Sequence, residues 1–589
     1  MRIVIVSPRG LLITPLVLGG YSIAPQAGLF RFDNFLARSP ELIPSVRNIW
    51  RHNIVGTSMY AVTRKLKALK AVFRAQRKKK GDLALNVKLA AEFLSIAQCI
   101  LHTDRHNSLL LCLEACCRLI FLKVTKLDQC MLQQRAKMQW LRGGDQCTRA
   151  FFRKIAKRRA AKRIYQINTA DGDTCTDQQA VINEFLGFFH QLLTGFSFPV
   201  TRAEIKQAFF DIEEDKAPGP DGYSSGFYKA AWPVIGEEIM VAVEEFFHNG
   251  RLLKQVNATL LALIPKVQNP ITVADFRPIS CCNVLFKAIT KILVQRIRPL
   301  LSRLVSPTQN AFIPGRMISD NILLAQELFA GYNQQRTPPR CAMKVDLRKA
   351  YDTVEWDFLL ATLELFGFPL IFIKWIEECV TTCSFSVCLN GNIHGFFGGA
   401  RGLTQGDPMS PYLFVLVMEV LCMILQQLIE QDEEFTFHWK CRDIGLFHLS
   451  FADDLLLFSS ADESSVGLFQ RGLQVFTSLL GLCANPAKSQ LIISKSAQPH
   501  RDQLLHLLGF KEGTLPVRYL GLPLISSRLT LLDCQPLLQK IDKRIGTWVG
   551  IPLSFAARVQ LIKSVLMAFN VYWGSAFILP KGVVRQIEK

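Results

Sequence analysis

Residues 448–460 read HLSFADDLLLFSS, and this stretch decides the fold around which the rest of the chain is organised. Two apolar runs flank Ala452, Asp453 and Asp454, which predicts a tight β-hairpin with both acids at its tip. Adjacent aspartates are also common in solvent-exposed turns, and that alternative stays open for the motif taken alone. The apolar flanks favour a position beside a packed sheet, where unpaired carboxylates are costly unless a cation is present.

A third acid follows a second short strand, in residues 342–354 (AMKVDLRKAYDTV). The predicted strand ends in Asp346, and Tyr351 stands five residues later, at the start of a predicted helix. A strand end beside a hairpin tip brings three carboxylates together. Hard oxygen ligands suit two Mg²⁺ ions, with Mn²⁺ as an alternative. Such a site predicts in-line displacement by a 3′-hydroxyl with pyrophosphate as the leaving group.

The segments around these acids alternate between strands and helices, which predicts an α+β fold. Residues 216–222 (KAPGPDG) form a turn that separates helical segments. The expected strands are 258–267 with a partner around Phe276, 341–347, 385–389 and a pair within 446–459. The expected helices are 284–304, 355–380, 410–430, 530–548 and 555–572.

The composition is that of a globular protein with a polyanionic partner. The 589 residues are 49% hydrophobic and 20% charged, with a formal net charge of +21. Residues 61–80 hold nine basic residues and no acid, and residues 131–170 hold eleven and one. Because these two tracts carry nearly all of the excess charge, they favour phosphate binding, although a solvated helix face is the alternative for each.

Membrane, secretion and zinc-binding classes are not favoured. The most apolar stretch, residues 412–429, contains Glu419 and two glutamines, so we expect a buried amphipathic helix and no membrane partner. The 17 cysteines are scattered and none form a C-x2-C pair, which indicates reduced, intracellular thiols.

Nine motifs in order resemble the reverse transcriptase of non-LTR (LINE-type) retrotransposons of the kind abundant in plant genomes. They are KAPGPDG, LIPK, FRPIS, FIPGR, DLRKAYDTV, RGLTQGDPMSP, FADD, GLCANPAKS and YLGLPL. The similarity runs from about residue 133 to the end and includes residues 30–80. It implies a right-hand polymerase of fingers, palm and thumb with a mostly helical, basic N-terminal extension. The implied divisions are 1–30 unassigned, 31–130 a helical remnant of the post-endonuclease region, 131–200 a basic RNA-binding extension, 201–300 fingers, 301–525 palm and 526–589 thumb.

The resemblance also implies a role for individual residues. Asp346, Asp453 and Asp454 would be the metal-binding palm carboxylates, and Tyr351 would be the steric gate against a 2′-hydroxyl. The other implied roles are triphosphate binding by Arg277 and Lys266, contact with the nascent base pair by Gln405 and Gly406, proton donation to pyrophosphate by Lys488, a primer grip at Tyr519, Leu520 and Gly521, and RNA binding by Arg153, Lys154, Arg158, Arg159, Lys162 and Arg163.

The expected activity is RNA-directed DNA polymerisation with an RNA template, a DNA primer and dNTPs, and no stable protein partner is evident. Tyr351 argues against an RNA-dependent RNA polymerase, because a bulky gate rejects ribonucleotides. An inactive or decaying RNA-binding protein is the other alternative. Residues 1–32 contain no Asp, Glu or His, and no RNase H domain follows the predicted thumb, so a truncated element is expected. The family implies a nuclear location.

Overall fold

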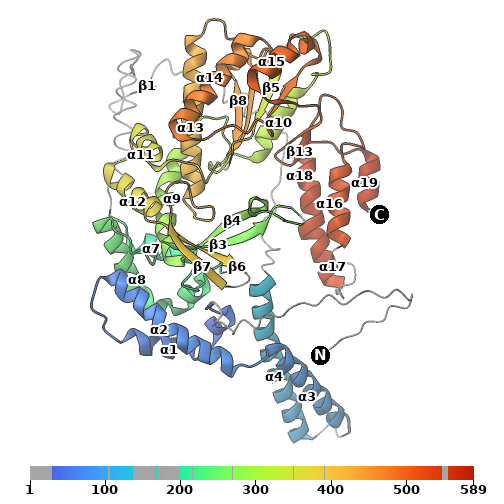
Figure 1. Ribbon diagram of the computed structural model, residues 1–589. Helices are drawn as coiled ribbons and strands as arrows, with labels where there is room; N and C mark the ends of the chain where they lie inside the picture. The colour runs from blue at the N-terminus through green and yellow to red at the C-terminus, as the bar shows by residue number, and fades with distance from the viewer. Residues whose placement is uncertain are drawn as a thin grey trace, which may run out of the picture.

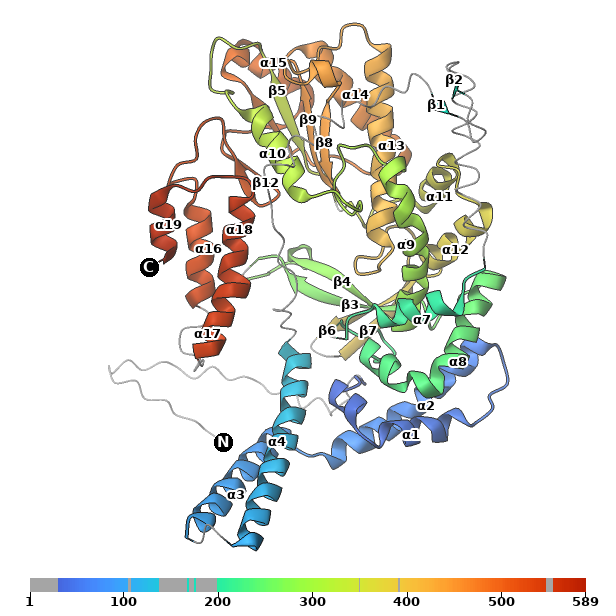
Figure 2. The same ribbon diagram turned by 180° about the vertical axis from the view of Figure 1, so that it is seen from behind.

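In a computed structural model, the chain folds into two larger β-sheets covered by helices (Figure 1). The structure describes residues 30–103, 107–136, 167–168, 174–175, 199–214, 216–267, 269–348, 350–389, 392–546 and 555–588. A five-stranded sheet lies at the top of Figure 1, and a four-stranded sheet lies below it. C-terminal helices stand beside both sheets, and a helical hairpin projects at the bottom (Figure 2).

The five-stranded sheet has the order β11-β10-β5-β9-β8, with β5 in its centre. Its strands are β5 (Cys341–Val345), β8 (His448–Phe451), β9 (Asp454–Ser459), β10 (Gln490–Ile493) and β11 (Lys511–Glu512). Leu455 and Leu457 of β9 pack into one hydrophobic core, whereas Leu456 and Phe458 pack into another. Since alternate side chains of a strand point to opposite faces, this sheet is buried on both sides, which fixes its register. The predicted strands within 341–347 and 446–459 are confirmed.

The four-stranded sheet has the order β4-β3-β6-β7. Its strands are β3 (Ala258–Pro265), β4 (Phe276–Cys282), β6 (Ser384–Leu389) and β7 (Asn392–Gly398). The predicted β3–β4 hairpin and the predicted strand at 385–389 are confirmed. Strand β7 was not predicted from the sequence. Its segment NIHGFFG is almost wholly exposed and contains two glycines, so it lacks the apolar alternation that marks a half-buried strand.

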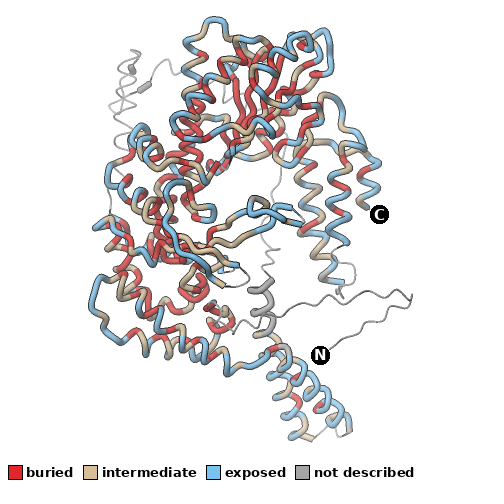
Figure 3. Tube along the Cα trace, in the orientation of Figure 1, coloured by how far each residue is buried: buried red, intermediate tan, exposed pale blue. Residues whose placement is uncertain are grey.

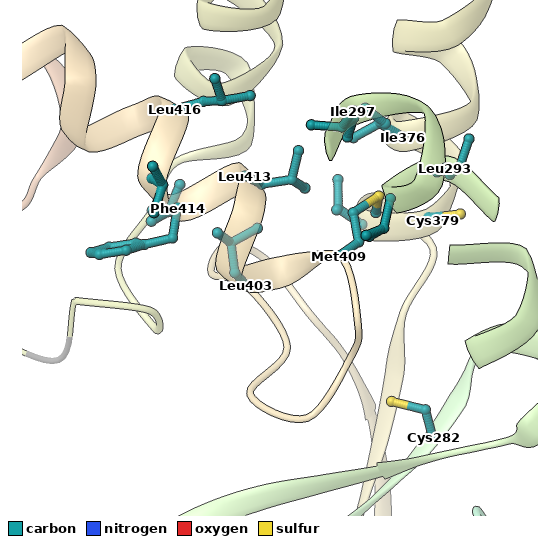
Figure 4. Close-up of a cluster of buried hydrophobic side chains, with 14 of the residues drawn as sticks. Cys282, Leu293, Ile297, Ile376, Cys379, Leu403, Met409, Leu413, Phe414 and Leu416 are labelled. Atoms are coloured by element: carbon teal, nitrogen blue, oxygen red, sulfur yellow. The ribbon is translucent and has the colours of Figure 1, made fainter. Parts of the chain in front are cut away.

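Two long helices form the core between the sheets. Helix α9 (Val284–Leu304) has the predicted bounds, and α13 (Ser410–Gln431) fits the prediction at 410–430. Their apolar faces meet with that of α12 (Leu370–Thr381), as the side chains in Figure 4 show. The remaining helices around these cores are α7 (Arg202–Phe210), α8 (Ser225–Asn249), α10 (Ile318–Phe329), α11 (Trp356–Leu365), α14 (Glu463–Leu480) and α15 (Arg501–Leu508).

Among the described residues, α13 is the one helix long and apolar enough to cross a membrane. Its most apolar window is 67% buried inside the protein. Glu419 lies within this buried part. The helix is therefore accounted for as a core helix, as the sequence predicted for residues 412–429.

The N-terminal helices α1 (Leu42–Trp50) and α2 (Ser58–Lys79) pack against α8. Helix α2 contains most of the first basic tract, and part of that charge is structural. Lys65 is buried and its Nζ lies 2.6 Å from Glu238 Oε1, and Arg77 forms an ion pair with Asp33. Lys65 and Arg77 therefore hold α2 in place, and phosphate binding by the other basic residues of the tract stays a prediction.

The C-terminal helices follow a small hairpin of β12 (Val517–Tyr519) and β13 (Leu522–Leu524). They are α16 (Gln535–Gly546), α17 (Phe555–Leu561), a π-helical turn (Ile562–Leu566), α18 (Met567–Gly574) and α19 (Lys581–Glu588). The helical predictions at 530–548 and 555–572 are confirmed, but α16 begins five residues late. Thr530 and Asp533 form a capped turn there, in which the Asp533 carboxylate accepts hydrogen bonds from the Thr530 backbone and hydroxyl.

Candidate active site

The three predicted aspartates lie at one edge of the five-stranded sheet. Strands β5 and β9 are antiparallel with Val345 opposite Leu455. Asp346 directly follows Val345, and Asp454 directly precedes Leu455. Because the strands are antiparallel, both acids lie next to this residue pair, at the same end of the two strands. Phe451 pairs with Asp454 and closes the β8–β9 hairpin, which leaves Ala452 and Asp453 at its tip. The prediction from the sequence, a strand end beside a hairpin tip, is the arrangement found.

The three aspartates at this edge lie close enough together to repel one another. Burial raises the pKa of Asp453, and the charge of Asp346 raises it further. Burial likewise raises the pKa of Asp454, with contributions from Asp453 and Asp346. Asp346 is held from the side, because Asn485 Nδ2 donates to its Oδ2 at 3.3 Å and Ser489 Oγ accepts from its backbone N–H at 3.1 Å.

Two basic residues partly offset these charges. Arg277, on β4 of the other sheet, is close enough to lower the pKa of Asp453, and Lys344 lowers that of Asp454. The Arg277 side chain is exposed, so it is accessible to an anionic ligand beside the aspartates. Lys266 is exposed beyond the end of β3, where its backbone N–H donates to the Asp275 carbonyl at 2.7 Å. The structure therefore brings Arg277 to the acids and places Lys266 at the outer end of the hairpin.

Tyr351 is fixed beside the aspartates by ring stacking. Its ring lies 4.5 Å from that of Phe414, with 19° between the planes. Burial raises the pKa of its hydroxyl, and the negative charge of Asp453 raises it further, so the hydroxyl stays protonated. The Tyr351 carbonyl accepts from the Leu403 backbone at 2.7 Å. Figure 4 shows Leu403 in the loop before α13 and Phe414 in α13 itself, so both partners of Tyr351 come from one continuous segment.

Gln405 and Gly406 belong to a loop that touches β4. The Ser280 backbone N–H donates to the Gln405 carbonyl at 2.8 Å. Gly406 has φ of 130°, and a Cβ there would lie 2.3 Å from the Ser280 carbonyl oxygen. The chain's own backbone at Ser280 therefore requires glycine at this position. Contact of either residue with a nascent base pair stays a prediction.

The predicted primer grip is a tight turn with a buried first residue. Leu520 and Gly521 have φ of 46° and 87°, as expected for a two-residue hairpin turn with both central residues left-handed. Tyr519 is only 1% exposed, and its hydroxyl accepts from Asn321 Nδ2 at 3.3 Å. The Tyr519 ring therefore supports the turn from within the core, and the role of the turn as a primer grip stays a prediction. Leu520 and Gly521 remain accessible.

Lys488 is the remaining predicted site residue in the described part of the chain. Lys488 is exposed in a turn, with its backbone N–H donating to the Asn485 carbonyl at 3.1 Å. A proton-donor role for it stays a prediction. The six residues predicted to bind RNA lie outside the described part of the chain: Arg153, Lys154, Arg158, Arg159, Lys162 and Arg163.

Gln309 is a residue that sequence reasoning missed. It is buried, and its Oε1 accepts hydrogen bonds from the backbone N–H groups of Ala452 and Ala311, both at 3.0 Å. Its Nε2 also faces the Ala452 carbonyl at 3.5 Å. Ala452 has φ of 54°, a left-handed conformation that is rare for alanine, and it directly precedes Asp453. Gln309 therefore binds both the backbone N–H and the carbonyl of Ala452, the strained residue of the acidic turn.

The segment around Gln309 is tied to β8 by further bonds. The Asn310 backbone donates to the Ser450 carbonyl at 3.2 Å, and the Ser450 backbone donates to the Thr308 carbonyl at 3.1 Å. Asn321 Nδ2 donates to the same Ser450 carbonyl at 2.7 Å. The sequence signal was a polar Thr-Gln-Asn triplet before the FIPGR motif, but nothing local tells which distant backbone those side chains bind.

The donor set fits a divalent cation in its chemistry. The three side chains offer carboxylate oxygens, and the raised pKa values of Asp453 and Asp454 indicate too little compensating positive charge. Within the described residues, no three acidic, histidine or cysteine side chains converge closely enough to form a complete metal cage. Mg²⁺ commonly binds one or two carboxylates and completes its shell with water and substrate phosphates, so such a cage is not required.

Comparison with known proteins agrees with this geometry. Residues 264–524 match the family described as reverse transcriptase (RNA-dependent DNA polymerase). The "Transposon TX1 uncharacterized 149 kDa protein" of Xenopus laevis is 25% identical over 476 residues, which cover 74% of this chain and 35% of that protein. The "Retrovirus-related Pol polyprotein from type-2 retrotransposable element R2DM" of Drosophila melanogaster is 26% identical over 390 residues, covering 64% of this chain and 35% of that protein. The chain thus spans about a third of the length of these relatives.

Among solved structures, an apo telomerase from Candida Tropicalis, truncated from the C-terminal domain, has a TM-score of 0.33 and 11% identity. The likeness covers 51% of this chain and 66% of that one, and it is too weak to establish the fold. The sequence matches are sufficient for a domain assignment. Residues 264–524 therefore form a reverse transcriptase domain, which is an RNA-directed DNA polymerase domain of the nucleotidyltransferase class, and the two relatives are proteins of a transposon and of a retrotransposable element.

Proposed function

We propose that the chain is an active RNA-directed DNA polymerase of a LINE-type retroelement, which extends a DNA 3′-hydroxyl along an RNA template with dNTPs. The observation that carries this proposal is the meeting of Asp346 with Asp453 and Asp454 at one sheet edge, inside the segment that matches reverse transcriptases. From the resemblance of the nine motifs to plant retrotransposons, the proposal also includes a plant-type lineage and a nuclear location.

The catalytic part of the proposal is phosphoryl transfer with two metal ions. The three aspartates would hold two Mg²⁺ or Mn²⁺ ions through their carboxylate oxygens. Such ions, when bound, favour deprotonation of the attacking 3′-hydroxyl and neutralise charge on the leaving pyrophosphate. Asn485 and Ser489 keep the Asp346 segment in place, and Gln309 does the same for the turn that carries Asp453.

The nucleotide would bind between the two sheets, with its phosphates near Arg277. The planar guanidinium of this residue offers several donors to a triphosphate, and its exposure leaves it accessible. Lys266 would add charge from the outer end of the hairpin, and Lys488 would donate a proton to pyrophosphate. Tyr351, held against Phe414, would occupy the volume that a ribonucleotide 2′-hydroxyl needs.

Primer extension tests the proposal. The purified chain, poly(rA)/oligo(dT), Mg²⁺ and dTTP should give extended products, and the Asp453→Asn/Asp454→Asn double variant should give none. Asp443→Asn is the control for the chemistry of the substitution, because Asp443 is an exposed aspartate just before the same hairpin and each Asp→Asn change removes one negative charge. Equal incorporation by the double variant and the parent would refute the assignment of the metal-binding acids.

The alternative function is RNA binding by an inactive, retroelement-derived protein. The second basic tract, residues 131–170, favours this alternative, because RNA binding by the tract could survive the loss of catalysis. A parent protein that binds RNA but incorporates no dTTP in Mg²⁺ or Mn²⁺ would support this alternative. Incorporation that is abolished in the double variant would exclude it.

A further inference from the structure

The helices α3 (Leu83–Thr103) and α4 (Ser108–Ala136) form a hairpin that projects from the body of the protein (Figures 1 and 2). The residues on their facing sides are buried or half-buried and repeat every three or four positions. In α3 these are Leu83, Val87, Ala90, Leu94, Ala97 and Leu101, and in α4 they are Leu110, Glu114, Cys117, Phe121 and Val124. This is the spacing of a helix–helix seam.

The seam is made partly of small and polar residues. Ala90 and Ala97 are buried in it, and Glu114 accepts hydrogen bonds from Gln98 across the hairpin and from Arg118. Larger apolar side chains lie outside the seam, in solvent, as the pale-blue segments of the hairpin in Figure 3 reflect. Phe93 is 63% exposed and Leu109 is 79% exposed. The hairpin therefore leaves unburied the side chains that would gain most from burial.

Most of these side chains form one stripe on each helix. The stripe of α3 is Leu85, Leu89, Phe93, Ile96 and Ile100, and that of α4 is Leu109, Leu113 and Ile120. At about 100° per residue, each stripe lies roughly 100° from its seam, in the same rotational sense on both helices. Because the helices are antiparallel, equal rotations bring both stripes to the same face of the hairpin. Leu111 and Leu122 project on the other side, beside Gln98 and Arg118.

We propose that this face binds the same face of a second copy of the chain, so that two hairpins form a four-helix bundle and the protein is a homodimer. A self-complementary patch of this kind is what a two-fold symmetric dimer requires. Helix α3 has 21 residues, so the face is about 30 Å long and about 20 Å wide across two helices. Two copies would bury about 1,200 Å², the lower end of the range for specific interfaces.

A membrane surface fits this face less well than a second copy does. Helices that lie on membranes carry many basic residues along their polar side. Helix α3 contains one lysine and one glutamate, and α4 contains four basic and two acidic residues, so the two helices together have a net charge of only +2 apart from the histidine of α3. The inference does not rest on the proposed polymerase activity, since α3 and α4 are remote in sequence from the aspartates.

Light scattering after size-exclusion chromatography tests the proposal on the full chain. The parent should have twice the mass of one chain, 66.4 kDa, at micromolar concentration. The Phe93→Glu/Ile96→Glu variant should be monomeric, because both side chains are exposed in the hairpin and would place four charges in the interface of two copies. Ala91→Glu/Ser95→Glu is the matched control on exposed positions outside the stripe of the same helix, and it should remain dimeric.

Circular dichroism would show whether each variant keeps its helices, and single substitutions at Leu89 and Leu113 would serve if the double variant fails to fold. A parent that is monomeric at about 50 µM would overturn the proposal. So would a dimer that survives the Phe93→Glu/Ile96→Glu substitution. A monomeric parent that binds a hydrophobic dye would mean an open face, and one that binds none would mean that another segment of the same chain covers it.

Discussion

Replacing Gln309 with leucine should lower both stability and turnover, although Gln309 is not expected to touch any substrate. The substitution introduces an apolar side chain of similar size and removes both polar atoms of the glutamine amide. It leaves the buried backbone N–H groups of Ala311 and Ala452 without their acceptor, which lay 3.0 Å from each. Each unsatisfied buried donor costs about 1–3 kcal/mol, so for two donors we expect the free energy of unfolding to fall by about 2–6 kcal/mol.

The effect on catalysis follows from the strained backbone at Ala452. A left-handed alanine costs about 1–2 kcal/mol, and Gln309 bonds this residue from both sides. Without those bonds the turn should relax and displace Asp453. A displacement near 1 Å costs about 10²-fold in rate. We therefore expect kcat for dTTP incorporation to fall by about 10- to 100-fold with little change in KM.

A second substitution separates strain from general destabilisation. Glycine adopts the left-handed conformation without steric cost, so Gln309→Leu/Ala452→Gly should recover about 1–2 kcal/mol of stability and part of the lost kcat. Urea unfolding and steady-state primer extension would measure both quantities, with Gln427→Leu, an exposed glutamine on α13, as the control. Parental turnover in Gln309→Leu, or a double variant no better than the single one, would refute this account of the turn.

Three further predictions follow from the same residues and from the sequence. Tyr351→Ala should raise incorporation of rNTPs relative to dNTPs, since truncation opens the volume beside Phe414, and an unchanged ratio would place the gate elsewhere. Burial raises the pKa of Glu419 from 4.5 to about 7, so the fold should lose stability as pH rises from 4.5 to 7, and Asp221 and Asp407 contribute in the same direction. The Glu419→Gln variant should lose less stability over this pH range in thermal melts. A variant with the same pH profile as the parent would contradict the burial of Glu419. Replacing Arg158, Arg159, Lys162 and Arg163 with glutamine should lower the slope of log K against log salt for single-stranded RNA by up to about 3, because each phosphate contact contributes about 0.7, and an unchanged slope would indicate a solvated helix face.

The sequence by itself determined the longest local elements and the residues of the acidic edge. Helix α9 was predicted with its observed bounds, because its apolar residues repeat at helical spacing over six turns. The strands that carry Asp346 and Asp454 were predicted because short apolar runs end in acids at turns. These signals are local, since backbone hydrogen bonding and burial of one face act within a few residues along the chain.

Only the tertiary structure decided which distant groups meet at that edge. Gly406 is required by the Ser280 carbonyl, Gln309 reaches Ala452 across 143 positions, and Tyr519 is buried against Asn321. Each contact depends on the packing of two sheets and their helices, and a single sequence carries no local pattern for it. The same holds for Arg277, for which the family resemblance implied triphosphate binding but whose position near Asp453 is set by the placement of β4. Residue types can be inferred from sequence where burial and periodicity are local, whereas partners separated by more than a hundred residues are fixed by the packed fold.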